Sequence, residues 1–205
     1  MLVIIDFGMG NLRSVYNKMK RLGCDVKISR NSEEIESADK LILPGVGNFA
    51  IGIKRLKERN QLDLIRQKVI KGKTPILGIC LGMQLFSMLS EEGESEGLGL
   101  INAKTIHFRL PEDLKYKLKV PHIGWNTVKI AGNSVLMKNI PDNALFYFVH
   151  SYHYVADNPD FITGITYYGY EFISLVEQGN IFGTQFHPEK SQDAGMQLLN
   201  NFVSY

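Results

Sequence analysis

The first eighty residues alternate short apolar runs with amphipathic patterns, and this alternation constrains the fold more than any other feature. Runs of Val, Ile and Leu predict strands at 2–6, 26–29, 40–43 and 74–79. Apolar residues three and four apart predict helices at 12–22, 49–71 and 81–89. We expect Asn11 to cap the first helix and the second helix to break near Asn60. Apolar strands that alternate with helices indicate a mostly parallel α/β sheet with helices on both faces.

The second half has a different pattern, in which strands follow one another with few helices between them. Strands are predicted at 103–108, 126–130, 144–149, 162–168, 173–177 and 181–185, and a closing helix at 194–203. This order predicts an antiparallel β extension of the sheet. The polar, acidic stretch 90–99 is expected to be a solvated surface loop. Because no linker interrupts the chain, we expect 1–205 to form a single domain.

Composition excludes several classes of protein. With 23 basic and 21 acidic residues the formal net charge is +2, so no dense basic face for nucleic acid is expected. No apolar run reaches the roughly 18 residues that a membrane helix needs. Two cysteines, Cys24 and Cys80, are too few for a disulfide framework, which favours a cytoplasmic protein. The five histidines are scattered without metal-ligand spacing, so no metal site is expected.

The candidate nucleophile is Cys80, in the sequence Gly-Ile-Cys-Leu-Gly at 78–82. This pattern is typical of a nucleophile elbow, a sharp strand-to-helix turn whose strained backbone needs glycines two residues to either side. The turn lifts the sulfur above the carboxyl edge of the sheet, and the start of a helix favours the thiolate. The Leu81 N–H would then point toward an oxygen bound beside the sulfur. The alternative is a buried structural cysteine at the end of a strand.

The candidate base is His187, in Phe-His-Pro-Glu-Lys-Ser at 186–191. Pro188 favours extended backbone at His187, and side chains two apart on extended backbone share a face. Glu189 could therefore orient the imidazole and leave its other nitrogen for Cys80. A lone histidine at the end of a strand is more often structural, but the cysteine elbow in the same chain favours a catalytic role.

Two glycine-rich loops follow predicted strands. Leu-Pro-Gly-Val-Gly at 43–47 could supply a second oxyanion-hole N–H beside Leu81, or could be an ordinary turn. The loop at 7–11 lacks the spacing of a phosphate-binding motif, and we interpret it as a tight turn at the same edge of the sheet, facing a partner.

Two further segments leave alternatives open. Val-His-Ser-Tyr-His-Tyr at 149–154 could contribute to a site or be a half-buried strand with a polar outer face. Pro-His-Ile-Gly-Trp-Asn at 121–126 contains the single tryptophan, which could simply anchor the core before a strand.

Together, these segments resemble the triad glutamine amidotransferases. The matching stretches are 78–84, 186–191 and 44–47, and the stretches 6–12, 121–126 and 148–153 make the chain similar to the branch of glutaminase subunits of imidazole glycerol phosphate synthase. The resemblance covers essentially the whole chain. It implies a flavodoxin-like central sheet and hydrolysis of L-glutamine to glutamate and ammonia.

The resemblance also implies roles for individual residues. Cys80, His187 and Glu189 would be the catalytic triad, working through a thioester. Leu81, Val46 and Gly47 would form the oxyanion hole. The implied glutamine-binding residues are Gln84, Gly45, His150, Ser151 and Tyr152. No cofactor is implied.

The implied partner is a (β/α)₈ cyclase that forms a heterodimer with the chain and receives ammonia through a tunnel. The residues expected at that interface are Gly8, Met9, Asn11, Pro121, His122, Trp125 and Asn126. Three alternatives stay open: a paralogous glutaminase that supplies a sugar-modifying enzyme of surface polysaccharide synthesis, a cysteine peptidase or deglycase-like hydrolase, and a non-catalytic regulatory module. Peptidases and deglycases on this fold often carry the triad histidine directly after the cysteine, whereas Leu81 follows Cys80 here.

Overall fold

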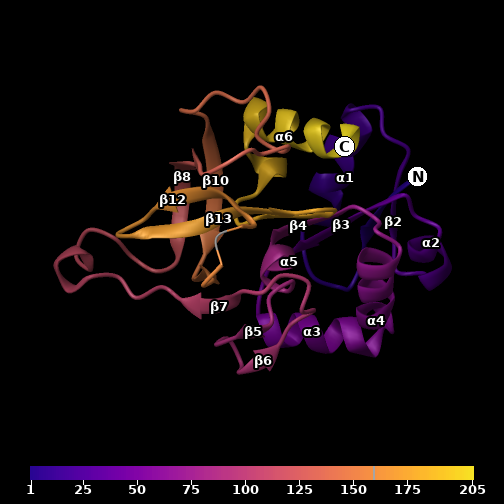
Figure 1. Cartoon of the computed structure of the whole chain (residues 1–205), viewed down its shortest axis with the longest axis horizontal. Coiled ribbons are helices and arrows are strands. Elements are labelled where there is room, and N and C mark those ends of the chain that lie inside the picture. The colour runs from indigo at the N-terminus through magenta and orange to yellow at the C-terminus, as the bar shows by residue number, and fades with distance from the viewer. Residues whose placement is uncertain (159) are drawn as a thin grey trace.

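A central sheet runs through both halves of the chain in the computed structural model, which describes residues 1–158 and 160–205 (Figure 1). Its parallel part has the order β2 (Val26–Ser29), β1 (Leu2–Ile5), β3 (Lys40–Gly45), β4 (Ile76–Cys80) and β14 (Ile181–Thr184). The strands β1 to β4 confirm the four apolar runs of the first half. Because β4 and β14 are parallel neighbours, the segments that follow them leave the sheet at the same edge.

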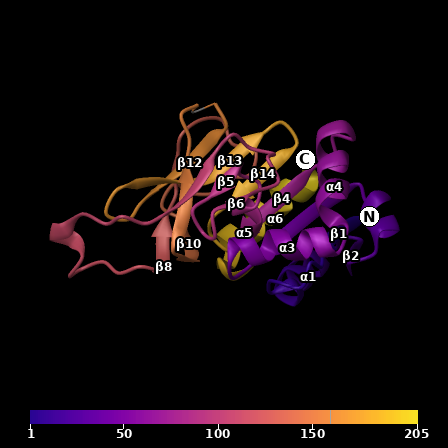
Figure 2. The same cartoon turned by 90° about the horizontal axis from the view of Figure 1, so that it is seen from below.

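The rest of the sheet is mostly antiparallel, as the second half of the sequence predicts. It continues from β14 through β13 (Glu171–Gln178), β11 (Tyr152–Val155), β7 (Lys104–His107), β5 (Leu89–Ser90) and β6 (Ser95–Glu96), with β12 (Ile162–Tyr167) and β9 (Lys129–Ile130) on the other side of β13. A separate antiparallel pair joins β8 (His122–Thr127) to β10 (Leu145–His150). Figures 1 and 2 both place β8, β10 and β12 at the end of the molecule away from the N-terminus.

Helices cover both faces of the parallel part (Figure 1). On one face lie α1 (Leu12–Arg21) and α6 (Gln192–Ser204), whose apolar side chains pack with Ile4 and Ile42. On the other lie α3 (Phe49–Glu58), α4 (Gln61–Arg66) and α5 (Leu81–Gln84), which pack with Val3 and Leu43. The alternation of strand side chains between these two clusters explains the near-continuous apolar runs of β1 and β3.

Short elements complete the chain. They are α2 (Ser32–Glu36), a π-helical turn at Gln67–Lys71 and 3₁₀ turns at Glu112–Leu114 and Pro188–Lys190. The expected break near Asn60 is confirmed, because Asn60 has a φ of 55° between α3 and α4. Asn11 caps α1 as expected, with its side chain accepting from the Ser14 N–H. No helix in the described ranges is both long and apolar enough to cross a bilayer.

The helix predicted at 81–89 is much shorter than expected. The carbonyl groups that follow α5 accept hydrogen bonds from the 98–101 segment instead of from a further helical turn. The Leu98 N–H donates to the Leu85 oxygen at 2.7 Å, and the Leu100 N–H donates to the Phe86 oxygen at 2.8 Å. These contacts compete with the next helical turn, so tertiary structure overrides the helical spacing of the apolar residues.

The stretch 90–99 lies at the surface as predicted, with Glu91, Glu94 and Glu96 exposed. It is not a wholly irregular loop, because part of it belongs to the β5–β6 hairpin and two of its acidic residues are engaged. Glu91 accepts from the His107 N–H at 3.0 Å and pairs with Arg109 at 2.7 Å. Glu92 accepts at 2.7 Å from the N–H of Phe49, the first residue of α3. A carboxylate is stabilised at a helix N-terminus, which accounts for the second contact.

Trp125 is not the core anchor before a strand that the sequence suggested. It lies within β8, which begins at His122, and 46% of it is exposed. Strand side chains alternate, so the same geometry that buries His122 turns Ile123 and Trp125 outward.

Candidate active site

Cys80 occupies a strained turn at the junction of β4 and α5. Its φ of 53° and ψ of −109° are unusual for a residue with a side chain, which confirms the predicted elbow geometry. Both flanking glycines are required: a Cβ on Gly82 would lie 1.7 Å from the Leu43 carbonyl oxygen, and one on Gly78 would lie 2.7 Å from the Met83 nitrogen. The turn therefore presents the sulfur at the carboxyl edge of the sheet.

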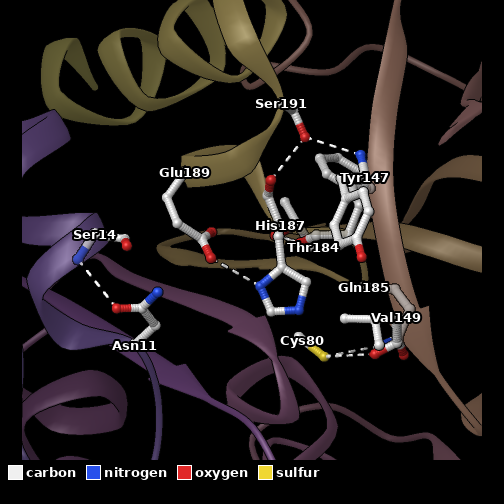
Figure 3. Close-up of polar contacts among 11 residues, drawn as sticks. Asn11, Ser14, Cys80, Tyr147, Val149, Thr184, Gln185, His187, Glu189 and Ser191 are labelled. Atoms are coloured by element: carbon white, nitrogen blue, oxygen red, sulfur yellow. Dashed lines mark hydrogen bonds and ion pairs between the residues drawn. The ribbon is translucent and has the colours of Figure 1, made fainter. Parts of the chain in front are cut away.

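His187 reaches the same edge from the end of β14 (Figure 3). Its Nδ1 lies 2.8 Å from Oε1 of Glu189, and Figure 3 shows the opposite edge of the ring turned toward Cys80. Nε2 is buried and has no hydrogen-bond partner among the described residues. A buried nitrogen that faces a thiol in this way is placed to exchange a proton with it.

The backbone route to this geometry differs from the expected one. His187 is extended, with φ −102° and ψ 92°, but Pro188 begins a 3₁₀ turn rather than continuing the strand. The turn, and not the two-residue repeat of extended backbone, brings Glu189 back to the imidazole.

The electrostatics favour an imidazolium. Burial on its own lowers the pKa of His187, but the Cys80 sulfur and the Glu189 carboxylate outweigh burial and raise this pKa to about 10. At neutral pH the imidazole therefore carries its proton, and its positive charge lies beside the Cys80 sulfur. Around the sulfur, Nε2 of Gln185 lies at 3.7 Å and the Val149 carbonyl oxygen at 3.8 Å.

The His187 backbone is hydrogen-bonded to β10. Its N–H donates to the Tyr147 carbonyl at 2.8 Å, and its own carbonyl accepts from the Ser191 hydroxyl at 2.6 Å. The same hydroxyl accepts from the Tyr147 N–H at 3.0 Å. Ser191 belongs to a motif that the sequence singled out, but this bridging role has no signal in the sequence.

A cavity of about 390 Å³ opens above Cys80. It is lined by Val46, Gly47, Cys80, Leu81, Gln84, Glu92, Pro121, Val149, His150, Ser151 and Tyr152. The structure thus brings the expected oxyanion-hole residues and most of the expected glutamine-binding residues to one cavity. Gly45 is the exception: it lies beneath α5, where a Cβ would come within 3.0 Å of the Leu81 Cβ, so it supports the elbow and does not line the cavity.

The two glycine-rich loops lie against each other beside this cavity. The 7–11 loop is the tight turn expected, with positive φ at Gly8 and Gly10. The Met9 methyl lies 2.9 Å from the position of a Cβ on Gly47. Arg55 of α3 binds the Gly8 carbonyl and fixes the turn. A substitution in either loop therefore displaces atoms of the other loop.

Two residues of the site escaped the sequence analysis. Glu92 contributes a carboxylate to the cavity but lies in the stretch interpreted as a solvated loop. Gln185 is fully buried, and its Oε1 accepts from Nε2 of Gln84 at 3.0 Å. A glutamine at the end of the strand predicted at 181–185 was the available signal for Gln185.

Of the two alternatives for 149–154, the structure favours contribution to a site, because residues 149–152 line the cavity, and a strand with a polar outer face is not observed. His150 and His153 are buried, with 6% and 2% exposed, because β10 ends at His150 and the chain turns into β11 between them. Only His150 of the two lines the cavity.

Most of the residues expected at a partner interface are accessible. Gly8, Asn11, Pro121 and Trp125 are exposed, whereas His122 is 2% exposed and points inward. A larger hollow of about 680 Å³ lies beside Trp125 and the start of α6, but neither Cys80 nor His187 lines it. The candidate active site is therefore identified by the side chains that line the smaller cavity, and not by the volume of either cavity.

An α/β sheet that presents a thiol and a buried imidazole–carboxylate pair at one edge is the architecture of enzymes that transfer acyl groups through cysteine. A family model described as glutamine amidotransferase class-I matches residues 3–204. The chain belongs to the class-I glutamine amidotransferases. This membership confirms the resemblance inferred from the motifs and makes the chain a glutaminase enzyme.

Curated relatives match the chain from end to end. It is 48% identical over 203 residues to "Imidazole glycerol phosphate synthase subunit HisH 2" of Methanococcus maripaludis, covering 99% of the chain and 98% of the relative. It is 42% identical over 207 residues to "Imidazole glycerol phosphate synthase subunit HisH" of Chlorobaculum tepidum, covering both proteins completely.

Solved structures share the fold at low sequence identity. A putative GMP synthase protein from Thermoplasma acidophilum superposes with a TM-score of 0.73 at 20% identity, covering 99% of this chain and 92% of that one. The PurLQS structure from Thermotoga maritima gives 0.74 at 18% identity, covering 100% and 97%. These matches confirm the flavodoxin-like α/β architecture.

Proposed function

We propose that the chain is the glutaminase subunit of an imidazole glycerol phosphate synthase and supplies ammonia for histidine biosynthesis. The relatives at 42–48% identity are named as subunits of that synthase, which favours the histidine pathway over the sugar-modifying alternative. The observation that carries the chemistry is the buried His187–Glu189 pair facing a cysteine in a strained elbow.

The mechanism begins with attack on the side-chain amide of glutamine. The Cys80 thiolate forms a bond to the amide carbon, and the oxygen becomes negatively charged. The first N–H of α5, on Leu81, has no partner within the helix and can bind this oxyanion, together with an N–H of the Val46–Gly47 loop. His187 then gives its proton to the nitrogen as the C–N bond breaks and ammonia leaves.

Water completes the cycle. Neutral His187 takes a proton from water, which attacks the thioester, and the C–S bond breaks to release glutamate and restore the thiolate–imidazolium pair. Glu189 holds the ring and stabilises its positive form. Glu92, the acidic group in the cavity lining, is placed to bind the α-amino group of glutamine, and Gln84 with the 150–152 backbone binds the rest of the head group.

The ammonia needs a protected route, because free ammonia is mostly protonated in neutral water and is then no nucleophile. The relatives' names describe subunits, so a complex is expected. We assign a (β/α)₈ cyclase as its other member, which docks on the 7–11 and 121–126 segments to form a heterodimer and receives ammonia through a tunnel. Exposed Ile123 and Trp125 on β8 give that surface an apolar centre.

The continuous sheet supports a single domain over 1–205, and free thiols at Cys24 and Cys80 support a cytoplasmic location.

Glutamate release from the chain with and without the cyclase and its phosphorylated substrate tests the proposal. We expect low activity alone, strong activation in the loaded complex, and loss of at least about 10⁴-fold in Cys80→Ala. A covalent glutamine analogue should label Cys80 in the complex. Undiminished release by Cys80→Ala, or hydrolysis of peptides but not glutamine, would contradict the assignment.

A further inference from the structure

Two histidines contact each other beneath the glutamine cavity. His122 of β8 and His150 of β10 face each other across the strand pair, with Nδ1 of His122 3.1 Å from Nε2 of His150. The His122 ring lies between Phe148 and Tyr168, with ring centroids at 4.8 and 4.0 Å. Nothing in the mechanism above uses His122.

The neighbours of the pair define which nitrogen carries each proton. His150 Nδ1 lies 2.8 Å from the Tyr152 carbonyl oxygen, which can only accept, so this nitrogen carries the proton and Nε2 is an acceptor. His122 must then donate from Nδ1 to His150. This leaves His122 Nε2 as an acceptor, and the Asn126 amide nitrogen lies 3.5 Å away.

The Asn126 amide cannot reverse this direction. Its nitrogen donates to the Tyr167 carbonyl at 2.9 Å, and its oxygen accepts from the Thr127 N–H at 2.9 Å. Both rings are also neutral at physiological pH: burial lowers the pKa of His122 to about 4 and holds the pKa of His150 well below its usual value. The hydrogen bonds that link Asn126, His122, His150 and Tyr152 therefore all point the same way, from the Asn126 amide to the Tyr152 carbonyl.

The chain of hydrogen bonds continues into the catalytic centre. The Tyr152 carbonyl also accepts from Nε2 of Gln84 at 2.9 Å, and the same nitrogen donates to Gln185 Oε1 at 3.0 Å. Because both contacts need N–H groups, the Gln84 amide oxygen is kept free as an acceptor. Gln185 in turn directs its own N–H groups at the Cys80 sulfur.

We propose that His122 is a positioning residue for glutamine: through His150 it fixes the Tyr152 carbonyl and with it the orientation of the Gln84 amide in the cavity. The inference rests on the proposed function of the cavity, because Gln84 and the 150–152 backbone are assigned there to the head group of glutamine. His122 acts on the geometry of glutamine binding and does not contact the reacting atoms.

The test is the variant His122→Phe in the complex with the cyclase. Phenylalanine retains the ring between Phe148 and Tyr168 but leaves His150 Nε2 without a donor. Loss of one positioning hydrogen bond is expected to raise KM for glutamine about three- to tenfold and change kcat by less than about twofold. A purely structural role would lower kcat through a smaller active fraction and leave KM unchanged, which would overturn the proposal.

His153→Phe is the matched control. His153 is as buried as His122 and, like His150, donates to a backbone carbonyl, that of Tyr154 at 2.9 Å. Its other nitrogen contacts the Tyr170 hydroxyl and not the cavity. We expect its KM to equal that of the wild type. An equal rise in KM in both variants would show a general effect of buried histidines and would refute the specific role.

Two further measurements distinguish the positioning role of His122 from a structural effect of the substitution. His122→Asn, which places an amide near the position of Nδ1, should recover part of the wild-type KM. Nitrogen-15 NMR of the histidines should find both His122 and His150 protonated at Nδ1, and an Nε2-protonated His150 would overturn the proposal. An inactive wild-type complex would instead refute the proposed function itself.

Discussion

Nδ1 of His187 lies 2.8 Å from Oε1 of Glu189, and both side chains are almost fully buried, with 3% and 2% exposed. The contact assigns one ring nitrogen to the carboxylate and leaves the other for Cys80. It also places a negative charge where solvent cannot screen it, so the pair controls the proton that the reaction moves.

Replacement of this carboxylate should impair turnover far more than binding. In Glu189→Gln we expect kcat to fall by about 10² to 10⁴-fold, because the neutral amide no longer stabilises the imidazolium. The high-pH limb of the activity profile should move to lower pH, since the carboxylate helps to raise the His187 pKa. Glu171→Gln, which removes an exposed carboxylate 3.8 Å from Lys129, is the control and should retain wild-type kinetics. An unchanged kcat in Glu189→Gln would remove Glu189 from the triad.

Stability should depend on pH through the same histidine. The pKa of His187 is about 10 in the folded chain and near its ordinary value of 6.5 when unfolded, so the folded state binds the proton more tightly. This contribution is complete below pH 6.5 and disappears as the pH rises to about 10. Thermal unfolding between about pH 6 and pH 10.5 should therefore show a steeper loss for the wild type than for His187→Gln. Parallel curves would contradict the raised pKa.

The elbow should tolerate no side chain at Gly82. A Cβ there would lie 1.7 Å from the Leu43 carbonyl, a backbone atom that cannot move without displacing β3. Gly82→Ala should cost more than about 3 kcal/mol, which corresponds to a fall in Tm of about 6–12 °C for a chain of this size. Gly132→Ala, with no atom of the described residues within 4 Å of the new Cβ, is the matched control and should stay close to the wild-type Tm. Equal Tm values for the two variants would refute the steric argument.

Ser191 should act on turnover through the position of His187. Ser191→Ala removes the hydroxyl that joins the His187 carbonyl to the Tyr147 N–H. We expect kcat to fall about three- to thirtyfold, since a small displacement of a catalytic group is costly. Restoration in Ser191→Thr, which keeps the hydroxyl, would separate this role from a change in packing, and an unaltered kcat in Ser191→Ala would dismiss it.

The parallel half of the fold was accessible to sequence reasoning because its strands are short, apolar and separated by clear helical periods. The α5 helix was overestimated because the spacing of apolar residues does not reveal that the 98–101 segment binds its carbonyls. Residues that act through long-range contacts were equally invisible. Glu92 caps a helix 43 residues earlier, and Gln185 meets Gln84 from 101 residues away.

The motif residues of the site, in contrast, could be predicted from the sequence. Gly78, Cys80 and Gly82 lie within a single short turn, so the strain they accommodate is local and has a local signature. His122 showed the limit of that approach: its motif suggested a surface role, whereas the alternation of β8 turns it into the interior.

The strands that carry the thiol and the imidazole, β4 and β14, are hydrogen-bonded neighbours although about half of the chain separates them. Everything between them is an excursion that departs from one strand and returns to the next. The loops of this excursion that do not line the cavity can therefore change in length and shape while the two reacting groups keep their spacing. Residues 84, 92 and 149–152 belong to the same excursion but line the cavity, so adaptation to new partners has to take place around them.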